Sequence, residues 1–122
     1  MLYSLSKMAI VFVIARDWTL RAAVRAELRE LGIEALGLES AEDVERALAA
    51  GQMPASAVLE ATADLAADPA VQSLVGRVPT IVIASRTESV PLPSVAAVLY
   101  RPVRVADIVS RVGDILIRGT TA

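Results

Sequence analysis

The chain contains no cysteine and no histidine. Without cysteine it has no disulfide bond, no thiolate nucleophile and no sulfur-ligated metal. Without histidine it lacks the commonest acid–base group at neutral pH and the commonest metal ligand. These two absences exclude much enzyme chemistry, and the lack of disulfides is compatible with a cytoplasmic protein.

Aromatic residues are scarce and neither sign of charge dominates. Phe, Trp and Tyr make up 3% of the chain, too little to build a platform on which bases stack. The 12 Lys and Arg residues nearly balance the 14 Asp and Glu residues, so the net charge is -2. Such a balance gives no general attraction to nucleic acid or to an anionic membrane. We therefore expect neither as a partner.

Long hydrophobic runs are absent as well. The apolar run Met8–Ala15 follows Lys7, as in a secretory signal, but it is shorter than the roughly 20 residues of a membrane span and leads directly into Arg16 and Asp17. A core strand is the better interpretation. The length of 122 residues suits one domain, over residues 8–118, after a tag remnant or disordered segment at 1–7 and before a tail at 119–122.

Five short apolar runs are present, and they alternate with segments of helical periodicity. The predicted strands are Ala9–Ala15, Ile33–Leu38, Ala57–Leu59, Thr80–Ala84 and Val98–Tyr100. The third and fourth runs have no polar alternation, which is typical of strands covered on both faces by helices.

Capping residues and apolar stripes predict the helices between these strands. The first helix follows Asp17 as N-cap and ends at Gly32, with a buried stripe of Leu20, Val24, Leu28 and Leu31. Its other face, expected to lie in water, carries Arg21, Arg25, Glu27, Arg29 and Glu30.

Similar signals predict three further helices. The second helix begins at a capping-box pattern, Ser40 with Asp43, and ends at Gly51. The third begins at Asp68-Pro69 and ends at Gly76. The last helix spans about 105–117, with a stripe of Val105, Ile108, Val109, Val112, Ile115 and Leu116.

The segment between the fourth and fifth strands differs from the others. Pro91 and Pro93 lie two residues apart and forbid a regular helix there. Strands that otherwise alternate with helices imply a flavodoxin-like α/β fold: a doubly wound, five-stranded parallel sheet with helices on both faces. The helix between the fourth and fifth strands is expected to be shortened or missing.

This layout resembles the receiver domain of bacterial response regulators, from Met8 to Ile117. The resemblance implies an acidic pair after the first strand that holds magnesium and an Asp after the third strand that accepts a phosphoryl group. It also implies a Ser or Thr after the fourth strand and a Lys-Pro pair after the fifth. The carboxylates hold a hard cation, the Asp is the nucleophile, and the hydroxyl and ammonium contact the product.

Most of these positions carry a different residue in this chain. When the chain is registered on Arg21, Ala15 and Arg16 occupy the places of the acidic pair, and Glu60 that of the phosphoacceptor. A slip of one residue would instead give Asp17 a metal role. We predict no catalytic residue, a lost magnesium site, no cofactor, and a degenerate phosphoacceptor pocket made of Ala15, Arg16, Asp17, Glu60, Ala84, Ser85, Arg101 and Pro102.

Charge pairing within this pocket has two interpretations. A guanidinium at Arg16 is expected to pair with Glu60, assisted by Arg101. In one interpretation the longer Glu60 side chain imitates the phosphorylated state. In the other, which we favour, Glu60 and the arginines only pair with one another at the strand ends and have no signalling role. The resemblance also implies a cis peptide between Arg101 and Pro102.

Two further features bear on partners. Trp18, at the start of the first helix, is expected to cover the end of the sheet rather than to bind a partner. The residues Val90, Leu92, Val95 and Tyr100 are expected either to form a partner surface or to cap the core in place of the missing helix.

The sequence therefore favours a non-enzymatic pseudo-receiver in the cytoplasm of a bacterium. It would act in a two-component-like signalling system through phosphorylation-independent binding to a protein partner or to a second copy in a homodimer. One alternative is an atypical receiver that is phosphorylated with the help of Glu60 and Asp17. Another is a small nucleotide- or flavin-binding protein, although the turn Ala15–Trp18 lacks the glycines of a phosphate loop.

Overall fold

The computed structural model describes residues 9–87 and 95–121, and it contains one parallel sheet in the order β2-β1-β3-β4-β5. The strands are β1 (Ile10–Ile14), β2 (Glu34–Leu38), β3 (Ser56–Glu60), β4 (Thr80–Ala84) and β5 (Ala97–Tyr100). The helices are α1 (Trp18–Glu30), α2 (Ala41–Ala49), α3 (Ala63–Ala67), α4 (Pro69–Arg77) and α5 (Val105–Thr121). The predicted flavodoxin-like fold class is confirmed.

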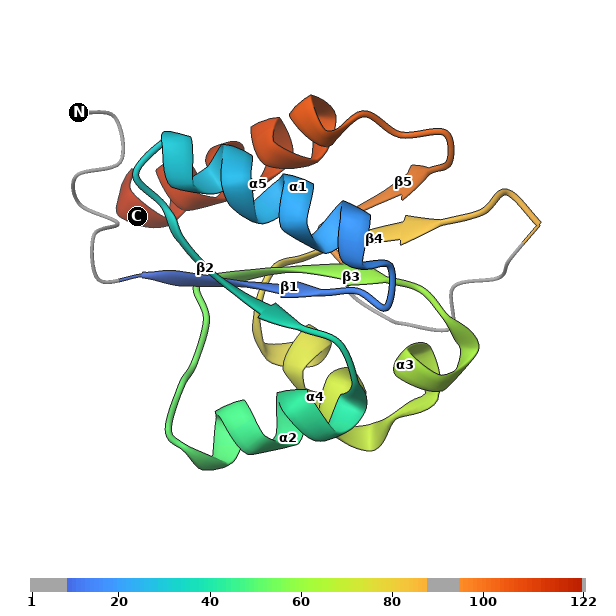
Figure 1. Cartoon of the computed structure of the whole chain (residues 1–122). Helices are drawn as coiled ribbons and strands as arrows, with labels where there is room; N and C mark the ends of the chain where they lie inside the picture. The colour runs from blue at the N-terminus through green and yellow to red at the C-terminus, as the bar shows by residue number, and fades with distance from the viewer. Residues whose placement is uncertain (1–8, 88–94, 122) are drawn as a thin grey trace.

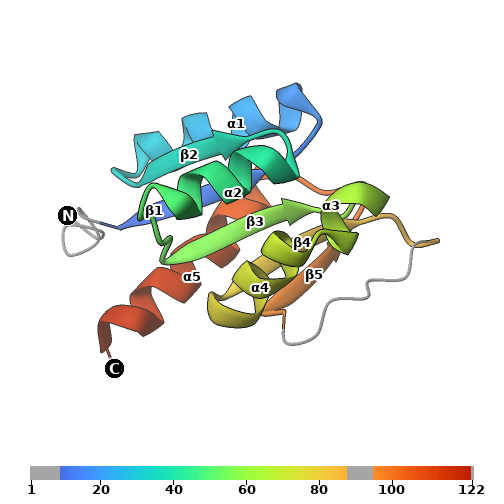
Figure 2. The ribbon, with the colours of Figure 1, turned by 90° about the horizontal axis from the view of Figure 1, so that it is seen from below.

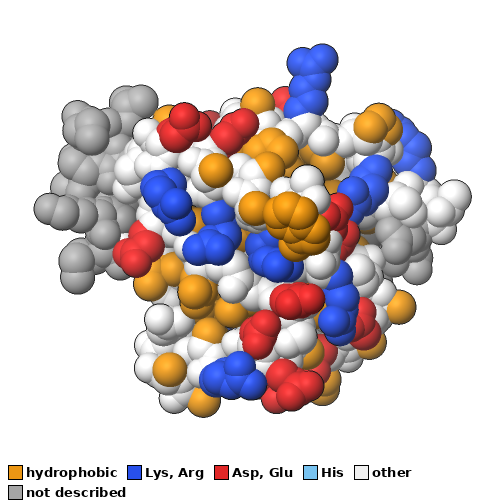
Figure 3. Space-filling model, viewed as in Figure 1, with side chains coloured by type: hydrophobic (Ala, Val, Ile, Leu, Met, Phe, Trp, Pro, Cys, Tyr) orange, Lys and Arg blue, Asp and Glu red, His pale blue; other side chains and the backbone are white. Residues whose placement is uncertain are grey.

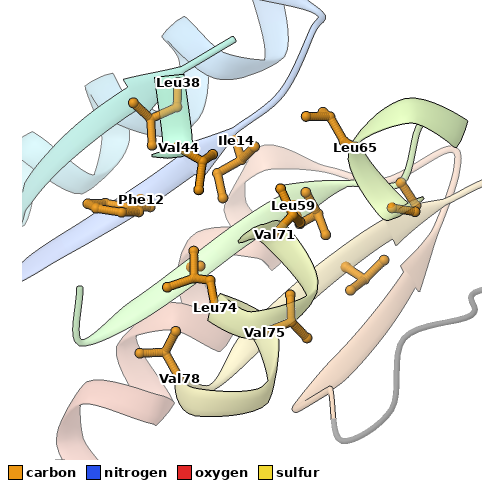
Figure 4. Packing of buried hydrophobic residues seen from close by; sticks show 14 of the residues in the cluster. Phe12, Ile14, Leu38, Val44, Leu59, Leu65, Val71, Leu74, Val75 and Val78 are labelled. Atoms are coloured by element: carbon orange, nitrogen blue, oxygen red, sulfur yellow. The ribbon is translucent and has the colours of Figure 1, made fainter. Parts of the chain in front are cut away.

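Helices cover both faces of the sheet. The helices α1 and α5 lie on one face and α2, α3 and α4 on the other (Figures 1 and 2). Successive residues of a strand point to opposite faces, so Phe12 and Ile14 join the core under α2, α3 and α4, whereas Val11 and Val13 join the core under α1 and α5. Figure 4 shows the first of these cores, with Leu59, Leu74 and other aliphatic side chains packed between sheet and helices.

The helices begin and end largely where the capping residues predict. The Asp17 carboxylate accepts hydrogen bonds from the backbone N–H groups of Thr19 (2.9 Å) and Leu20 (3.3 Å). Gly32 follows the C-cap of α1 with φ of 80°, a left-handed conformation that glycine adopts without strain. Asp68 caps α4 in the same way as Asp17 caps α1, and Pro69 occupies the first turn.

The predicted water-facing side of α1 is partly wrong. Arg21 and Arg25 are half-buried, and their guanidinium groups donate to the backbone oxygens of Ala15 (2.6 Å) and Ala35 (3.4 Å). Arginine can bury its aliphatic stem while its charged end reaches water or a polar group, so a charged residue need not face away from a sheet. Conversely, Leu31 from the predicted buried stripe is 40% exposed, because it lies at the C-cap where the helix leaves the sheet.

Two helical stretches differ from the sequence prediction. The short helix α3 was not predicted, and α5 continues to Thr121 through Gly119, where a tail was expected. Within the described residues no helix is long and apolar enough to cross a membrane.

The connection from β4 to β5 is described only at its two ends. Neither residues 85–87 nor residues 95 and 96 form a helix. The predicted partner residues Val90 and Leu92 lie outside the described residues. Val95 packs against the core under α2, α3 and α4, which agrees with a capping role for this residue, and Tyr100 is 42% exposed.

Candidate functional site

The predicted pocket residues come together at the carboxyl edge of the sheet. In a parallel sheet the strands all end at this edge, where binding sites of α/β proteins usually form. Ala15, Glu60, Ala84 and Arg101 each stand at or next to the end of a strand. A hydrogen bond of 2.9 Å from the Arg101 N–H to the Ala84 oxygen joins two of these ends directly.

Glu60 lies at the centre of the site. Its Oε1 accepts hydrogen bonds from the backbone N–H groups of Arg16 (2.8 Å) and Asp17 (3.1 Å), and its Oε2 accepts one from Nη2 of Arg101 (2.6 Å). The Glu60 side chain is 12% exposed. One carboxylate at the end of β3 therefore holds the loop after β1 and the loop after β5, and the predicted pairing of Glu60 with Arg101 is confirmed.

The Arg16 side chain takes a different partner from the one predicted. Its guanidinium pairs with Asp64 of α3, with Nε donating at 2.9 Å and Nη2 also contacting the same oxygen, Oδ2. The expectation that this guanidinium pairs with Glu60 is wrong, because the backbone N–H of Arg16, not its side chain, approaches Glu60. The Arg16 and Asp64 side chains are about half exposed.

The pair between Arg16 and Asp64 shifts both ionisation equilibria. Hydrogen bonds from Arg16, and then from the Thr62 hydroxyl at 2.7 Å, lower the pKa of Asp64 to about 2. The Asp64 carboxylate in turn raises the pKa of Arg16. Each charged form is favoured by its partner, so both groups are ionised over the neutral range.

The remaining predicted residues add little chemistry to the pocket. Asp17 caps α1 with its carboxylate, while Ala84 is buried and carries no hydroxyl. The Ser85 hydroxyl lies 3.1 Å from that of Thr87. Arg101 and Pro102 are joined by a cis peptide, as predicted.

Trp18 does not cover the end of the sheet. Its side chain is 69% exposed at the first position of α1, and the expectation of a buried cover is therefore wrong. At the first helical position the ring projects from the loop end of α1, beyond the turns whose residues Val24 and Leu28 bury against the sheet.

Two residues of the site were missed from the sequence, namely Thr62 and Asp64. They belong to α3, where Thr62 is the N-cap and Asp64 is an acidic residue in the first turn. A Thr followed by an Asp after the end of a strand is itself a signal for a helix start. That signal could have placed Asp64 next to the end of β3.

The described carboxylates at this edge are not gathered in a cluster. Among residues 9–87 and 95–121, no group of three or more Asp or Glu side chains is placed to hold a metal ion. Both Glu60 oxygens already accept hydrogen bonds, and Arg101 adds positive charge beside them.

Comparison with known proteins gives matches in structure but not in sequence families. No family model matches the chain, and no curated protein matches it. A response regulator receiver protein from Burkholderia phymatum superposes with a TM-score of 0.73 at 23% identity, over 88% of this chain and 94% of that chain. A CheY-like receiver domain protein from Methanospirillum hungatei gives a TM-score of 0.73 at 14% identity, over 91% and 98%.

A third structure extends the same result. An orphan response regulator of H. pylori matches with a TM-score of 0.67 at 17% identity, over 88% of this chain and 96% of that chain. All three superpositions extend over nearly the whole length of the matched chains. The chain has the fold of response regulator receiver domains.

Proposed function

We propose that this chain is a pseudo-receiver, a signalling domain that acts through protein contact and not through phosphoryl transfer. The observation that carries the proposal is the engagement of both oxygens of Glu60, at the position where the receiver resemblance implies a phosphoacceptor. In this proposal the domain has no catalytic residue and binds no magnesium.

The chemistry of phosphoryl transfer supports this proposal. A carboxylate nucleophile needs a lone pair directed at phosphorus and a cation that neutralises the phosphoryl oxygens. The Oε1 atom of Glu60 accepts two backbone N–H groups, and attack through Oε2 would require displacement of Arg101. Ala15 and Arg16, at the places of the acidic pair, offer no carboxylate for magnesium.

The hydrogen bonds of Glu60 also favour a fixed conformation. They join the loops after β1 and β5 to the end of β3 without a metal ion or a phosphoryl group. A domain held in this way does not depend on phosphorylation for its shape, so its signal is the presence or absence of a bound protein. A more specific form of the same proposal is that Glu60 imitates the phosphorylated state.

The surface beside β5 is one place where a protein partner or a second copy would bind in this proposal. Leu99, Tyr100, Pro102 and Val103 line a groove of about 290 Å³ against α5, together with polar residues of that helix. The guanidinium of Arg86 lies 5.7 Å from the centre of the Tyr100 ring. Tyr and Arg are both enriched at protein interfaces.

An intact-mass measurement tests the proposal. The domain is incubated with magnesium and acetyl phosphate, beside a phosphorylatable receiver domain as positive control. We expect no added phosphoryl mass on this chain. A stable adduct that is lost in Glu60→Gln or Asp17→Asn would show that the domain is phosphorylated, and would favour the atypical receiver instead.

A variant that restores the implied acids sharpens this test. The triple substitution Ala15→Asp, Arg16→Asp, Glu60→Asp supplies an acidic pair and an acceptor of the usual length. If only this variant gains phosphoryl mass, the lost carboxylates account for the inert behaviour of the natural chain. Circular dichroism verifies that the variant is folded.

A further inference from the structure

A row of arginines lies along one open edge of the sheet. Arg21, Arg25 and Arg29 are spaced by four residues on α1 and so share one side of this helix. The neighbouring strand β2 is the outer strand of the sheet, and no described strand pairs with its other side. Figure 3 looks onto this edge and shows basic side chains following α1 above β2.

These arginines have no acidic partner within the described part of the chain. The ion pairs within 4.0 Å that involve described residues join Arg16 to Asp64, Arg46 to Asp43 and Arg101 to Glu60. Arg21 and Arg25 each donate to one backbone oxygen, as described above. A guanidinium has five N–H donors, so both retain donors for a further acceptor.

Gly37 allows the arginine side chains to reach the edge. A Cβ atom at this position of β2 would lie 2.9 Å from Cδ of Arg25 and 3.2 Å from Cδ of Arg21. Ala35, the other β2 residue on this face, is also small. The two arginine stems therefore lie across the strand. The charged end of Arg25 reaches the outward-facing Ala35 oxygen, and that of Arg21 reaches the Ala15 oxygen beyond the end of β1.

The backbone of β2 has groups that point away from the sheet. The Leu38 oxygen accepts from the Ala15 N–H, so the polar groups of Leu38 face β1. Because these groups alternate along a strand, those of Ala35 and Gly37 point outward. The contact of Arg25 with the Ala35 oxygen agrees with this direction. Gly37 in particular offers an N–H and a C=O to an added strand.

The face of β2 that is turned toward α2 is hollow. A groove of about 360 Å³ lies between β2 and α2, with Leu38, Ala47 and Ala50 among its lining residues. Asp43 and Arg46 also line it. The side chains of an added strand alternate between the two faces of the sheet. One set would meet the arginines, and the other would meet this groove.

We infer that the edge of β2 binds an extended segment of a partner protein in which acidic residues alternate with small apolar residues. The acidic side chains pair with Arg21, Arg25 and Arg29, and the apolar side chains enter the groove beside Leu38. Backbone hydrogen bonds to Ala35 and Gly37 add the segment as a sixth strand, a known mode of peptide recognition. Arg25 gives up its long contact with Ala35 when the segment binds.

Charge also selects against other arrangements of this edge. Asp43, in the first turn of α2, lines the groove beside its ion-pair partner Arg46, so the groove offers no excess of positive charge to a segment whose acids point that way. A second copy paired antiparallel through β2 would bring its own arginine row to the same face of the joined sheet. The repulsion between the two arginine rows disfavours such a dimer.

The inference rests on the proposed function only in that the domain acts by protein contact. The β2 edge does not include Glu60, and the experiment below uses no phosphodonor. A domain that accepts a phosphoryl group could still bind the peptide, and a domain that ignores the peptide could still be inert to acetyl phosphate. The two failures are therefore distinguishable.

Fluorescence anisotropy with a synthetic peptide tests the inference. The probe is a fluorescein-labelled peptide of three Glu-Val repeats between Ser-Gly ends, and a peptide of three Lys-Val repeats is the comparator. We expect binding of the Glu-Val peptide that weakens as salt is added, and no binding of the Lys-Val peptide. The double variant Arg21→Glu, Arg25→Glu should weaken Glu-Val binding by about tenfold or more and reverse the preference.

A matched variant controls for total charge. Arg77→Glu with Arg104→Glu makes the same charge change at two exposed positions away from β2, and it should bind the Glu-Val peptide like the natural chain. If the variant at Arg21 and Arg25 does not fold, the exposed Arg29→Glu gives the same comparison. Equal binding of the two peptides, or equal loss in both double variants, would overturn the inference.

Two further measurements test the mode of binding. Amide signals of Ala35 and Gly37 should shift in NMR spectra when the Glu-Val peptide is added. Of two peptides, one N-methylated at every Glu and one at every Val, the one whose methyl groups face β2 should not bind. Binding that survives both N-methylations, or that leaves these two amides unchanged, would contradict strand addition. Sedimentation that reveals a dimer closed through β2 would also overturn it, in favour of a second copy as the occupant.

Discussion

Glu60 joins three parts of the chain through one carboxylate. Its side chain is largely buried, and it accepts from two backbone N–H groups after β1 and from the Arg101 guanidinium after β5. Hydrogen bonds to a charged acceptor contribute about 1.5–3 kcal/mol each when they are shielded from water. The stability of this edge of the sheet therefore depends on a residue that the receiver resemblance would assign to chemistry.

Glu60→Ala should lower the free energy of unfolding by about 4 kcal/mol, because two N–H groups and one guanidinium lose their acceptor. Glu60→Gln should lose about half as much, since the amide oxygen can still accept the backbone N–H groups. Urea unfolding followed by circular dichroism measures both. Glu45→Ala, at an exposed position of α2, is the control. A Glu60→Ala variant as stable as that control would mean that Glu60 does not join these loops.

The sequence allowed this site to be located but not its pairing to be assigned. Residues that follow parallel strands must meet at one edge, which was enough to bring Glu60 and Arg101 together. The partner of Arg16 depended on the direction of its side chain and on a short helix, α3, that no periodic pattern revealed. A five-residue helix is too short to show a stripe. Asp64 was missed for the same reason.

At the scale of elements, apolar patterning fixes how α5 packs. Ile108, Val109, Val112 and Leu116 are buried against the face of the sheet that α1 also covers. Ser110 and Arg111 lie between them in sequence and are exposed. The helix therefore has one orientation about its own axis, set by the spacing of its apolar residues.

Val112→Asp should destabilise the domain by about 4 kcal/mol or more, because it places an unpaired carboxylate where the native side chain is fully buried. Ser110→Asp introduces the same group on the exposed side of the same helix and should change stability by less than about 0.5 kcal/mol. Thermal unfolding measures both variants. If Val112→Asp melts like Ser110→Asp, α5 packs through a different face.

Elements with a clear period could be predicted, and those governed by context could not. The five strands followed from short apolar runs and the longer helices from stripes between capping residues. The last helix was expected to end near residue 117, before a tail that begins at Gly119, but α5 continues to Thr121. The half-buried Arg21 and Arg25 could not be foreseen, because the space for their stems comes from Gly37 on another element.

At the scale of the whole molecule, the absence of histidine determines how stability depends on pH. Residues 9–118 contain no side chain with an ordinary pKa between those of the carboxylates and those of the basic groups and tyrosine. Asp64, held by Arg16, has a pKa of about 2, and the pKa of Asp43 is lowered by the backbone N–H of Glu39. These two carboxylates bind protons more weakly in the folded chain than in the unfolded chain.

The urea midpoint should therefore stay constant between about pH 5.5 and 7 and fall as the solution is made more acidic. A lowered folded pKa contributes stability that is complete above the unfolded value, near 3.9, and is lost as the pH falls toward 2. Asp64→Asn removes one such group, so the variant should start from a slightly lower midpoint and lose less stability between pH 5 and 2.5. The change is small because Asp64 is half exposed.

Glu45→Gln serves as a control for this pH experiment, because it removes one exposed carboxylate of α2 without touching the pair of Arg16 and Asp64. Its acid dependence should match that of the natural chain. A clear slope between pH 5.5 and 7 would contradict the expectation, since it would require a titrating group that the described chain does not supply. If the Asp64→Asn variant loses as much stability between pH 5 and 2.5 as the natural chain does, the contact of Asp64 with Arg16 does not persist in solution. In that case the ion pair of Glu60 and Arg101 alone would hold this edge of the sheet.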